Sequence, residues 1–133
     1  ASGGETSRLM LAMKTVLSDV DAVPTLIFDE IDAGIGGHTG DVVGHKLWRL
    51  SQDHQVFCVT HLPQIARYAA QHFQVAKHTS DDRTFSTARP LSLDERVDEL
   101  AIMIGGAATE AHRRGARELL AYSQAQADGS SSR

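Results

Sequence analysis

Two short apolar runs, separated by a glycine-rich segment and a helix-like pattern, constrain the fold of this chain most. Residues 25–28 are Thr-Leu-Ile-Phe, and residues 55–60 are Gln-Val-Phe-Cys-Val-Thr. Continuous apolar runs of this length suit strands that are buried on both faces, as in a parallel sheet. Between them, glycines in residues 31–40 predict a loop, and apolar residues at helical spacing predict a helix over about residues 38–52. This order predicts an α/β domain with a mainly parallel sheet.

Further elements are predicted on either side of this unit. Ser2 and Glu5 have the spacing of a capping box, and Leu9, Met13 and Val16 recur at helical spacing, so a helix is expected over about residues 3–19. A proline at residue 63 predicts a helix over about residues 63–70. Two strands, over residues 73–79 and 84–91, predict a hairpin on the edge of the sheet.

The C-terminal part of the sequence predicts two more helices and a tail. Ser92 and Glu95 form a second capping box for a helix that ends at Ile104, before two glycines. Another helix is expected over about residues 109–122. Residues 124–133 are rich in serine, alanine and glutamine and predict a disordered tail, so the domain is expected over residues 1–123.

Length and composition narrow the class of protein. The chain has 133 residues, of which 41% are hydrophobic and 23% charged, which is typical of one globular domain. Its net charge of −4 argues against wholesale electrostatic binding to DNA.

The single cysteine, Cys58, excludes an internal disulfide and fits a reduced cytoplasmic setting. No apolar run approaches the roughly 18 residues of a membrane span. The first residue is Ala1, directly before a glycine-rich motif, so we expect a piece of a longer protein.

Charged side chains follow both predicted parallel strands directly. Asp29 and Glu30 come after the first strand, and His61 comes after the second. Side chains at the carboxyl ends of strands in an open α/β sheet face a ligand site. A Mg²⁺ ion near the first carboxylate and a polarised water near the second would relieve their repulsion. The alternatives are a solvated acidic pair and an ordinary surface histidine, and only their combination favours a site.

The first residues form a second candidate site. Ser2, Gly3 and Gly4 stand at a predicted helix start, where free N–H groups and the helix dipole favour an anion. A plain helix cap would explain Ser2 and Glu5, but it would not explain two glycines that weaken the first turn. At this point anion binding and simple capping remain equally open.

These motifs, taken in order, resemble the C-terminal lobe of an ABC-type ATPase head. Residues 1–5, Ala-Ser-Gly-Gly-Glu, resemble its signature motif, with alanine where transporters usually have leucine. Residues 26–30 resemble a Walker B strand, Asp32 the start of a D-loop, and His61 the switch histidine. Residues 29–37 and 59–66, together with residues 95–106, closely resemble the RecN family of bacterial SMC-like DNA double-strand-break repair proteins. The resemblance covers about residues 1–123.

The resemblance implies a role for each motif. Asp29 would hold Mg²⁺ through a water molecule, Glu30 would polarise the attacking water, and His61 would contact the γ-phosphate of ATP. Ser2, Gly3, Gly4 and Glu5 would bind nucleotide held by the opposite head of an ATP-dependent homodimer. Asp32 would lie at the dimer interface. The implied partners are an N-terminal P-loop lobe of the same protein, a second head, and DNA through the full-length protein, in the bacterial nucleoid and without a membrane.

Two expected features of such a protein are missing from the sequence. A P-loop needs a Gly-Lys pair, and none occurs; nor is there a long heptad segment for a coiled coil. We therefore expect a split head, of which this chain is the C-terminal lobe and inactive as an ATPase alone. The alternatives are the motor lobe of another ABC ATPase and a non-catalytic interaction module.

The remaining polar residues receive simpler interpretations. His112, Arg113, Arg114 and Arg117 form a basic stripe that is more typical of a solvated helix face than of a DNA contact. His38, His45 and His54 lack acid or sulfur partners at ligand spacing, so zinc is not expected. Cys58 lies within a predicted core strand and is expected to be an inert, small hydrophobic residue.

Overall fold

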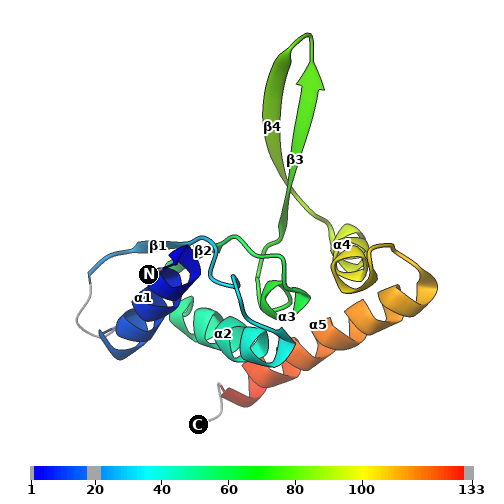
Figure 1. The fold of residues 1–133 in the computed structure, drawn as a ribbon. Coiled ribbons are helices and arrows are strands. Elements are labelled where there is room, and N and C mark those ends of the chain that lie inside the picture. The colour runs from blue at the N-terminus through cyan, green and yellow to red at the C-terminus, as the bar shows by residue number, and fades with distance from the viewer. Residues whose placement is uncertain (1, 18–21, 131–133) are drawn as a thin grey trace.

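The computed structural model describes residues 2–17 and 22–130 as five helices and four strands (Figure 1). The order of elements follows the sequence prediction closely. The elements are α1 (Gly3–Leu17), β1 (Thr25–Phe28), α2 (Gly37–Leu50), β2 (Gln55–Cys58), α3 (Pro63–Ala66), β3 (Phe73–Ser80), β4 (Arg83–Pro90), α4 (Leu93–Gly105) and α5 (Glu110–Ser130).

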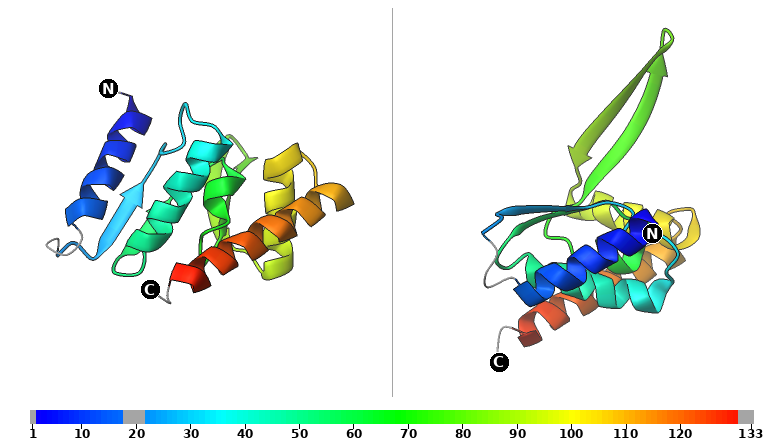
Figure 2. Two further views of the ribbon diagram at one scale, coloured as in Figure 1. Left: turned by 90° about the horizontal axis from the view of Figure 1, so that it is seen from below. Right: turned by 60° about the vertical axis from the view of Figure 1, so that its left-hand side comes forward.

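The predicted parallel pairing is confirmed. Strand β1 pairs with β2 in parallel, with Leu26 opposite Val56 and Phe28 opposite Cys58. Helices α1 and α2 lie together on one face of this pair (Figure 2). A first core fills the space between the helices and the strands, and its buried members are Leu11, Leu26, Phe28, Ile31, Val43, Leu47, Leu50 and Ile65.

The opposite face of the parallel pair is open, which differs from the expected burial on both faces. Side chains alternate across a strand, so Ile27 and Phe57, which are register partners, point away from the helices. Ile27 is 73% exposed and Phe57 is 47% exposed, and Val59 just beyond β2 is 56% exposed. The expectation was wrong because no element within the described residues covers this face of the strands.

A second core joins the C-terminal helices to α3. Its buried members are Ala66, Val97, Leu100, Ala101, Ala116 and Leu120, from α3, α4 and α5. Helix α4 begins with the predicted capping box of Ser92 and Glu95 and ends at Gly105. The next residue, Gly106, caps it with a left-handed φ of 81°, which favours glycine. Ile65 belongs to the first core and Ala66 to the second, so the short helix α3 connects the two.

The buried side chain of Arg67 strengthens this junction between the two cores. Its guanidinium pairs with Asp41 of α2 and stacks on Tyr68 and Tyr122, at 4.9 and 4.6 Å from the ring centroids. The hydroxyl of Ser123 in α5 donates to the Arg67 carbonyl at 3.0 Å. Residues from α2 and α5 are thereby held to the segment that follows α3.

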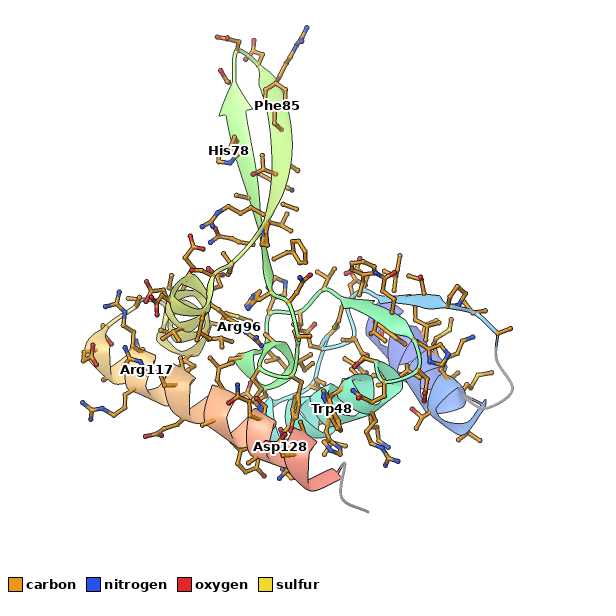
Figure 3. All side chains as sticks on the ribbon, turned by 180° about the vertical axis from the view of Figure 1, so that it is seen from behind. Trp48, His78, Phe85, Arg96, Arg117 and Asp128 are labelled. Carbon is orange, nitrogen blue, oxygen red and sulfur yellow. The ribbon has the colours of Figure 1, made fainter. Side chains whose placement is uncertain are left out.

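The predicted hairpin forms, but it does not lie on the edge of the parallel sheet. Strands β3 and β4 make a separate antiparallel pair that projects from the body (Figure 1). His78 and Phe85, which are register partners, lie well out on this arm (Figure 3). The sequence pattern identified both strands correctly, but alternation along a strand carries no information about which other strand it joins.

Three helices differ in length or burial from the prediction. Helix α3, expected over residues 63–70, ends at Ala66. Helix α5 continues to Ser130, so most of the segment expected as a disordered tail is helical up to that residue. Alanine and glutamine are strong helix formers, which explains the extension of α5 over residues 124–128. In α1, Leu9, Met13 and Val16 are 63, 54 and 81% exposed, while Leu11 supplies the buried contact. The expected residues 18 and 19 of α1 and the last three residues of the chain lie outside the described residues.

Across the described ranges, none of the helices combines the length and the apolar character that crossing a membrane would require.

Candidate functional site

The predicted site residues gather where β1 and β2 end. Because the two strands are parallel and in register, their carboxyl ends lie at the same edge, and the Val59 N–H donates to the Phe28 carbonyl at 2.9 Å. Asp29 and Glu30 directly follow β1, and His61 follows shortly after β2. The predicted juxtaposition of the two strand ends is therefore present.

Both carboxylates after β1 are exposed. The Glu30 backbone N–H donates to Asp29 Oδ1 at 2.8 Å, which orients the Asp29 side chain. Glu30 has a φ of 56°, in the left-handed region that non-glycine residues rarely adopt. Such backbone strain persists only where surrounding contacts hold it, and it is common at functional sites. The chain turns sharply here, and the Ala33 N–H donates to the Glu30 carbonyl at 3.1 Å.

Asp32 joins the loop after β1 to the end of β2. Its Oδ2 accepts hydrogen bonds from the Thr60 hydroxyl and from the His61 backbone N–H, both at 2.6 Å. Partial burial alone would raise the pKa of the Asp32 carboxyl. These two hydrogen bonds, together with its own backbone N–H and the charge of His61, outweigh the effect of burial and hold the pKa below its ordinary value. Asp32 is therefore ionised at neutral pH and holds the backbone of His61, whose side chain is exposed.

The start of α1 forms the expected capping box. The Glu5 N–H donates to the Ser2 hydroxyl and the Ser2 N–H donates to the Glu5 carboxylate, both at 3.2 Å. Gly4 is buried, and a Cβ added to it would lie 2.8 Å from Ala33 Cβ and 2.9 Å from the Glu30 carbonyl oxygen. This close approach requires glycine at residue 4, which a simple cap does not. The first turn of α1 therefore packs directly against the loop after β1.

Two further side chains of α1 bind the same loop. The Ser7 hydroxyl donates to the Asp29 carbonyl at 2.6 Å. Arg8 Nη1 donates to the Ala33 carbonyl at 2.7 Å and to the Ile31 carbonyl at 3.2 Å. Three backbone carbonyls of the loop are thus held by two consecutive residues of one helix.

The thiol of Cys58 lies beneath the same strand end. Burial, with the nearby charges of Asp32 and Asp29, raises the pKa of Cys58 to about 12. The thiol is therefore protonated at neutral pH, and as a thiol it is a poor nucleophile and a poor metal ligand.

The carboxylates after β1 suit Mg²⁺ better than zinc. No three of the acidic, histidine and cysteine side chains in the described ranges are placed to hold one metal ion. Mg²⁺ is usually bound by one or two carboxylates, with substrate phosphates and waters completing its shell. The exposed Asp29 carboxylate, fixed through one oxygen, fits that manner of binding.

The basic stripe on α5 is partly neutralised by acids. Arg113 Nε lies 2.7 Å from Asp98 Oδ1, and Arg117 Nη1 lies 3.3 Å from Glu110 Oε1. These ion pairs agree with the interpretation of the stripe as a solvated helix face.

Sequence reasoning missed three residues at this site, namely Ser7, Arg8 and Thr60. Ser7 and Arg8 lie on a helix turn with no recognisable pattern of their own, and their partners are backbone atoms more than twenty residues away. Thr60 stands beside His61 in the sequence, but only the fold brings its hydroxyl to Asp32.

The fold is that of the C-terminal lobe of an ABC-type ATPase head. A solved structure from work on the ATP-driven dimerization and DNA-stimulated activation of SMC ATPases is similar to the chain, with a TM-score of 0.54. The similarity covers 71% of this chain and 56% of that structure's chain, at 24% sequence identity. It confirms the predicted class of fold.

The chain resembles DNA repair protein RecN over most of its length, which confirms the resemblance of its motifs. It is 50% identical over 121 residues to RecN of Haemophilus influenzae and 50% identical over 121 residues to RecN of Deinococcus radiodurans. These alignments cover 90 and 91% of the chain. RecN of Treponema pallidum is 53% identical over 106 residues, or 80% of the chain and 18% of that protein.

The chain is much shorter than these relatives. It spans 22% of the Haemophilus influenzae protein and 21% of the Deinococcus radiodurans protein. No protein-family model matches the chain.

Proposed function

We propose that this chain is the C-terminal ATPase-head lobe of a RecN-like DNA double-strand-break repair and recombination protein. It serves ATP-driven dimerisation of two heads and hydrolysis of the bound ATP. DNA is engaged by the full-length protein rather than by this lobe, whose net charge is −4. The similarity to RecN and to an SMC ATPase supports the class of activity.

The residues after β1 and β2 act on nucleotide bound to their own head. Asp29 holds Mg²⁺, which when bound neutralises charge on the phosphates of ATP. Glu30 accepts a proton from the attacking water, a role worth roughly 10²- to 10⁴-fold in rate. His61 contacts the γ-phosphate and helps to orient that water. Support for this division comes from the exposure of all three side chains at one edge of the strands.

The start of α1 acts on nucleotide bound to the opposite head. Ser2 and Gly3 are exposed at a helix N-terminus, where N–H groups and the helix dipole favour phosphate oxygens. Gly4 and Glu5 shape this turn, through close packing on the loop and through the capping box. Asp32 lies between the two sets of residues and couples them at the interface between heads.

The open face of the parallel pair receives the N-terminal P-loop lobe of the same protein. Ile27 and Phe57 are large apolar side chains that remain exposed on this face. Removing apolar surface from water stabilises a protein by about 25 cal/mol per Å², so a second lobe that covers them would be stabilising. The P-loop lobe would also supply the N–H groups and the lysine that hold the β- and γ-phosphates, which this chain lacks.

One observation carries this proposal above the others. The loop after β1 meets both the switch-histidine segment, through Asp32, and the first turn of α1, through Gly4. A solvated acidic pair on an interaction module would not require either contact.

The direct test of the proposal mixes two inactive variants of the full-length protein. Glu30→Gln removes the base from its own head, and Ser2→Arg blocks the site formed with the opposite head. In a mixed dimer, one of the two sites keeps a native Glu30 and a native Ser2. The mixture should therefore recover up to about one quarter of wild-type ATP hydrolysis.

A mixture that stays inactive, although mixed dimers form, would contradict the proposal because it would place both residues in the same site. The matched control is a mixture of Glu118→Gln with Ser92→Arg. Glu118 is an exposed glutamate of α5, and Ser92 caps α4 with the same motif as Ser2. Each control variant should retain activity alone.

A further inference from the structure

The proposed function gives no role to Ser7 and Arg8, although both donate hydrogen bonds to the loop after β1. Both residues lie on α1, the helix whose first turn is proposed to serve the opposite head. Their acceptors, the carbonyls of Asp29, Ile31 and Ala33, belong to the loop that carries the proposed base of the same head. One helix thus presents residues for two different active sites.

The loop after β1 depends on these contacts for its shape. Glu30 has a left-handed φ of 56°, a conformation that non-glycine residues rarely adopt. The carbonyls on either side of Glu30 are held from one direction by Ser7 and Arg8. The Asp32 carboxylate is held from the other direction by Thr60 and His61. Glu30 stands between these two sets of bonds.

The packing of helix α1 allows a shift of its first turn to reach the loop after β1. Leu11 is 2% exposed within the first core, one turn beyond Arg8. At the other end, Gly4 fits against Glu30 and Ala33 with no space for a Cβ. A shift of the first turn of α1 would therefore press on the loop directly and pull on its carbonyls through Arg8.

We propose that Arg8, assisted by Ser7, is a positioning residue that sets the place of Glu30 according to the position of α1. This inference rests on the proposed function, in which the opposite head's nucleotide engages the start of α1. Closure of the two heads would then bring Glu30 into its working position, so that hydrolysis follows assembly of the dimer. The guanidinium suits this task because it is planar and permanently charged, and its Nη1 donates to the carbonyls of both Ile31 and Ala33.

The proposal predicts a specific kinetic defect in Arg8→Met of the full-length protein. The kcat for ATP hydrolysis should fall roughly 10- to 100-fold, since a displaced catalytic group costs rates of this order. The KM for ATP and the ATP-dependent dimerisation should stay within about twofold, because no nucleotide contact is removed. Arg8→Lys should recover part of the loss. Arg49→Met, at an exposed arginine in the last turn of α2, is the matched control and should turn over ATP normally.

Complementation separates positioning from a structural role of Arg8 in α1. If Arg8 acts through its own Glu30, Arg8→Met should be rescued by mixing with Ser2→Arg and not by mixing with Glu30→Gln. If Arg8 only maintains the start of α1, the opposite pattern should appear, and the proposal is overturned. Ser7→Ala is a smaller change and should show the same pattern of rescue. It replaces Arg8→Met in this experiment if Arg8→Met does not fold.

Failure of this inference is distinct from failure of the proposed function. If Ser2→Arg and Glu30→Gln rescue each other while Arg8→Met and Ser7→Ala both hydrolyse ATP at the wild-type rate, only the positioning role is wrong. If Ser2→Arg and Glu30→Gln do not rescue each other, the assignment of the two sites fails first, and the positioning role fails with it.

Discussion

The Thr60 hydroxyl donates a 2.6 Å hydrogen bond to the Asp32 carboxylate and so fastens the end of β2 to the loop after β1. The same hydroxyl accepts a hydrogen bond from the Leu62 N–H at 3.0 Å. Thr60 therefore organises the segment around His61 as well as the loop that carries Glu30. Its position between two motifs that are far apart in sequence makes it a sensitive point of the site.

Thr60→Val removes this hydroxyl but keeps the size and shape of the side chain. We expect a loss of about 2 kcal/mol in the free energy of unfolding, since Asp32 loses a hydrogen bond to its charged group. Urea unfolding of the 133-residue chain measures this loss. Thr60→Ser should be close to wild type, and Thr84→Val, at an exposed threonine of β4, is the matched control. An unchanged stability of Thr60→Val would show that the hydrogen bond is not important.

Glu30→Gln tests the base directly. The amide keeps the size and hydrogen-bonding capacity of the side chain but cannot accept the proton from water. In the full-length protein, ATP should still bind and dimerise the heads, while turnover falls at least about 10²-fold. Steady-state ATP hydrolysis and size-exclusion chromatography with ATP measure the two effects. Wild-type turnover in this variant would remove Glu30 from the mechanism.

Ser2→Arg tests the action of α1 on the opposite head. The arginine should block ATP-driven dimerisation of the variant with itself, where it stands in both sites, and leave ATP binding by each separate head nearly intact. Loss of the capping bond alone costs about 1 kcal/mol, and Ser92→Arg carries the same cost in α4 without affecting dimerisation. Equal loss of ATP binding by the separate head would show that Ser2 acts within its own head or in folding.

Cys58 should resist thiol reagents in the folded chain. Burial beside Asp32 and Asp29 raises its pKa from 9.0 to about 12. Deprotonation of Cys58 therefore requires a higher pH in the folded chain than in the unfolded chain. At pH 8 the thiolate fraction of the folded chain is therefore much smaller than that of the unfolded chain. The reaction with a disulfide reagent should slow at least about tenfold, since the higher nucleophilicity of a high-pKa thiolate offsets part of the loss. Unfolding in urea should restore the fast reaction. A fast reaction of the folded chain at pH 8 would contradict the burial of this strand end.

The sequence predicted those parts of the structure that depend on local patterns. Both capping boxes, both parallel strands and the two strands of the hairpin follow from residue spacing. The motifs predicted the edge of the strands at which the candidate residues gather. The hairpin was placed wrongly because the pairing of β3 and β4 with other strands is a long-range choice. The open face at Ile27 and Phe57 was not predicted because an apolar run looks the same whichever part of a protein covers it.

Within the site, residue type identified the acidic and histidine side chains but not the residues that hold them. Arg8 and Ser7 bind backbone carbonyls, and a carbonyl has no sequence signature. A simple helix cap does not explain the glycine at residue 4. The structure explains it, because Gly4 packs against Glu30 and Ala33 with no space for a Cβ. The assignment of separate roles to Ser2 and Glu30 remains a prediction.

ATP hydrolysis by a reconstituted head tests the central claim most directly. The 133-residue chain alone should bind ATP at millimolar strength at best and hydrolyse none, because it lacks a P-loop. Co-expression with a separate N-terminal lobe that carries the P-loop should restore Mg²⁺-dependent hydrolysis, and Glu30→Gln in this chain should abolish it again. Micromolar ATP binding by the chain alone, or an inactive complex of the two lobes, would contradict the account.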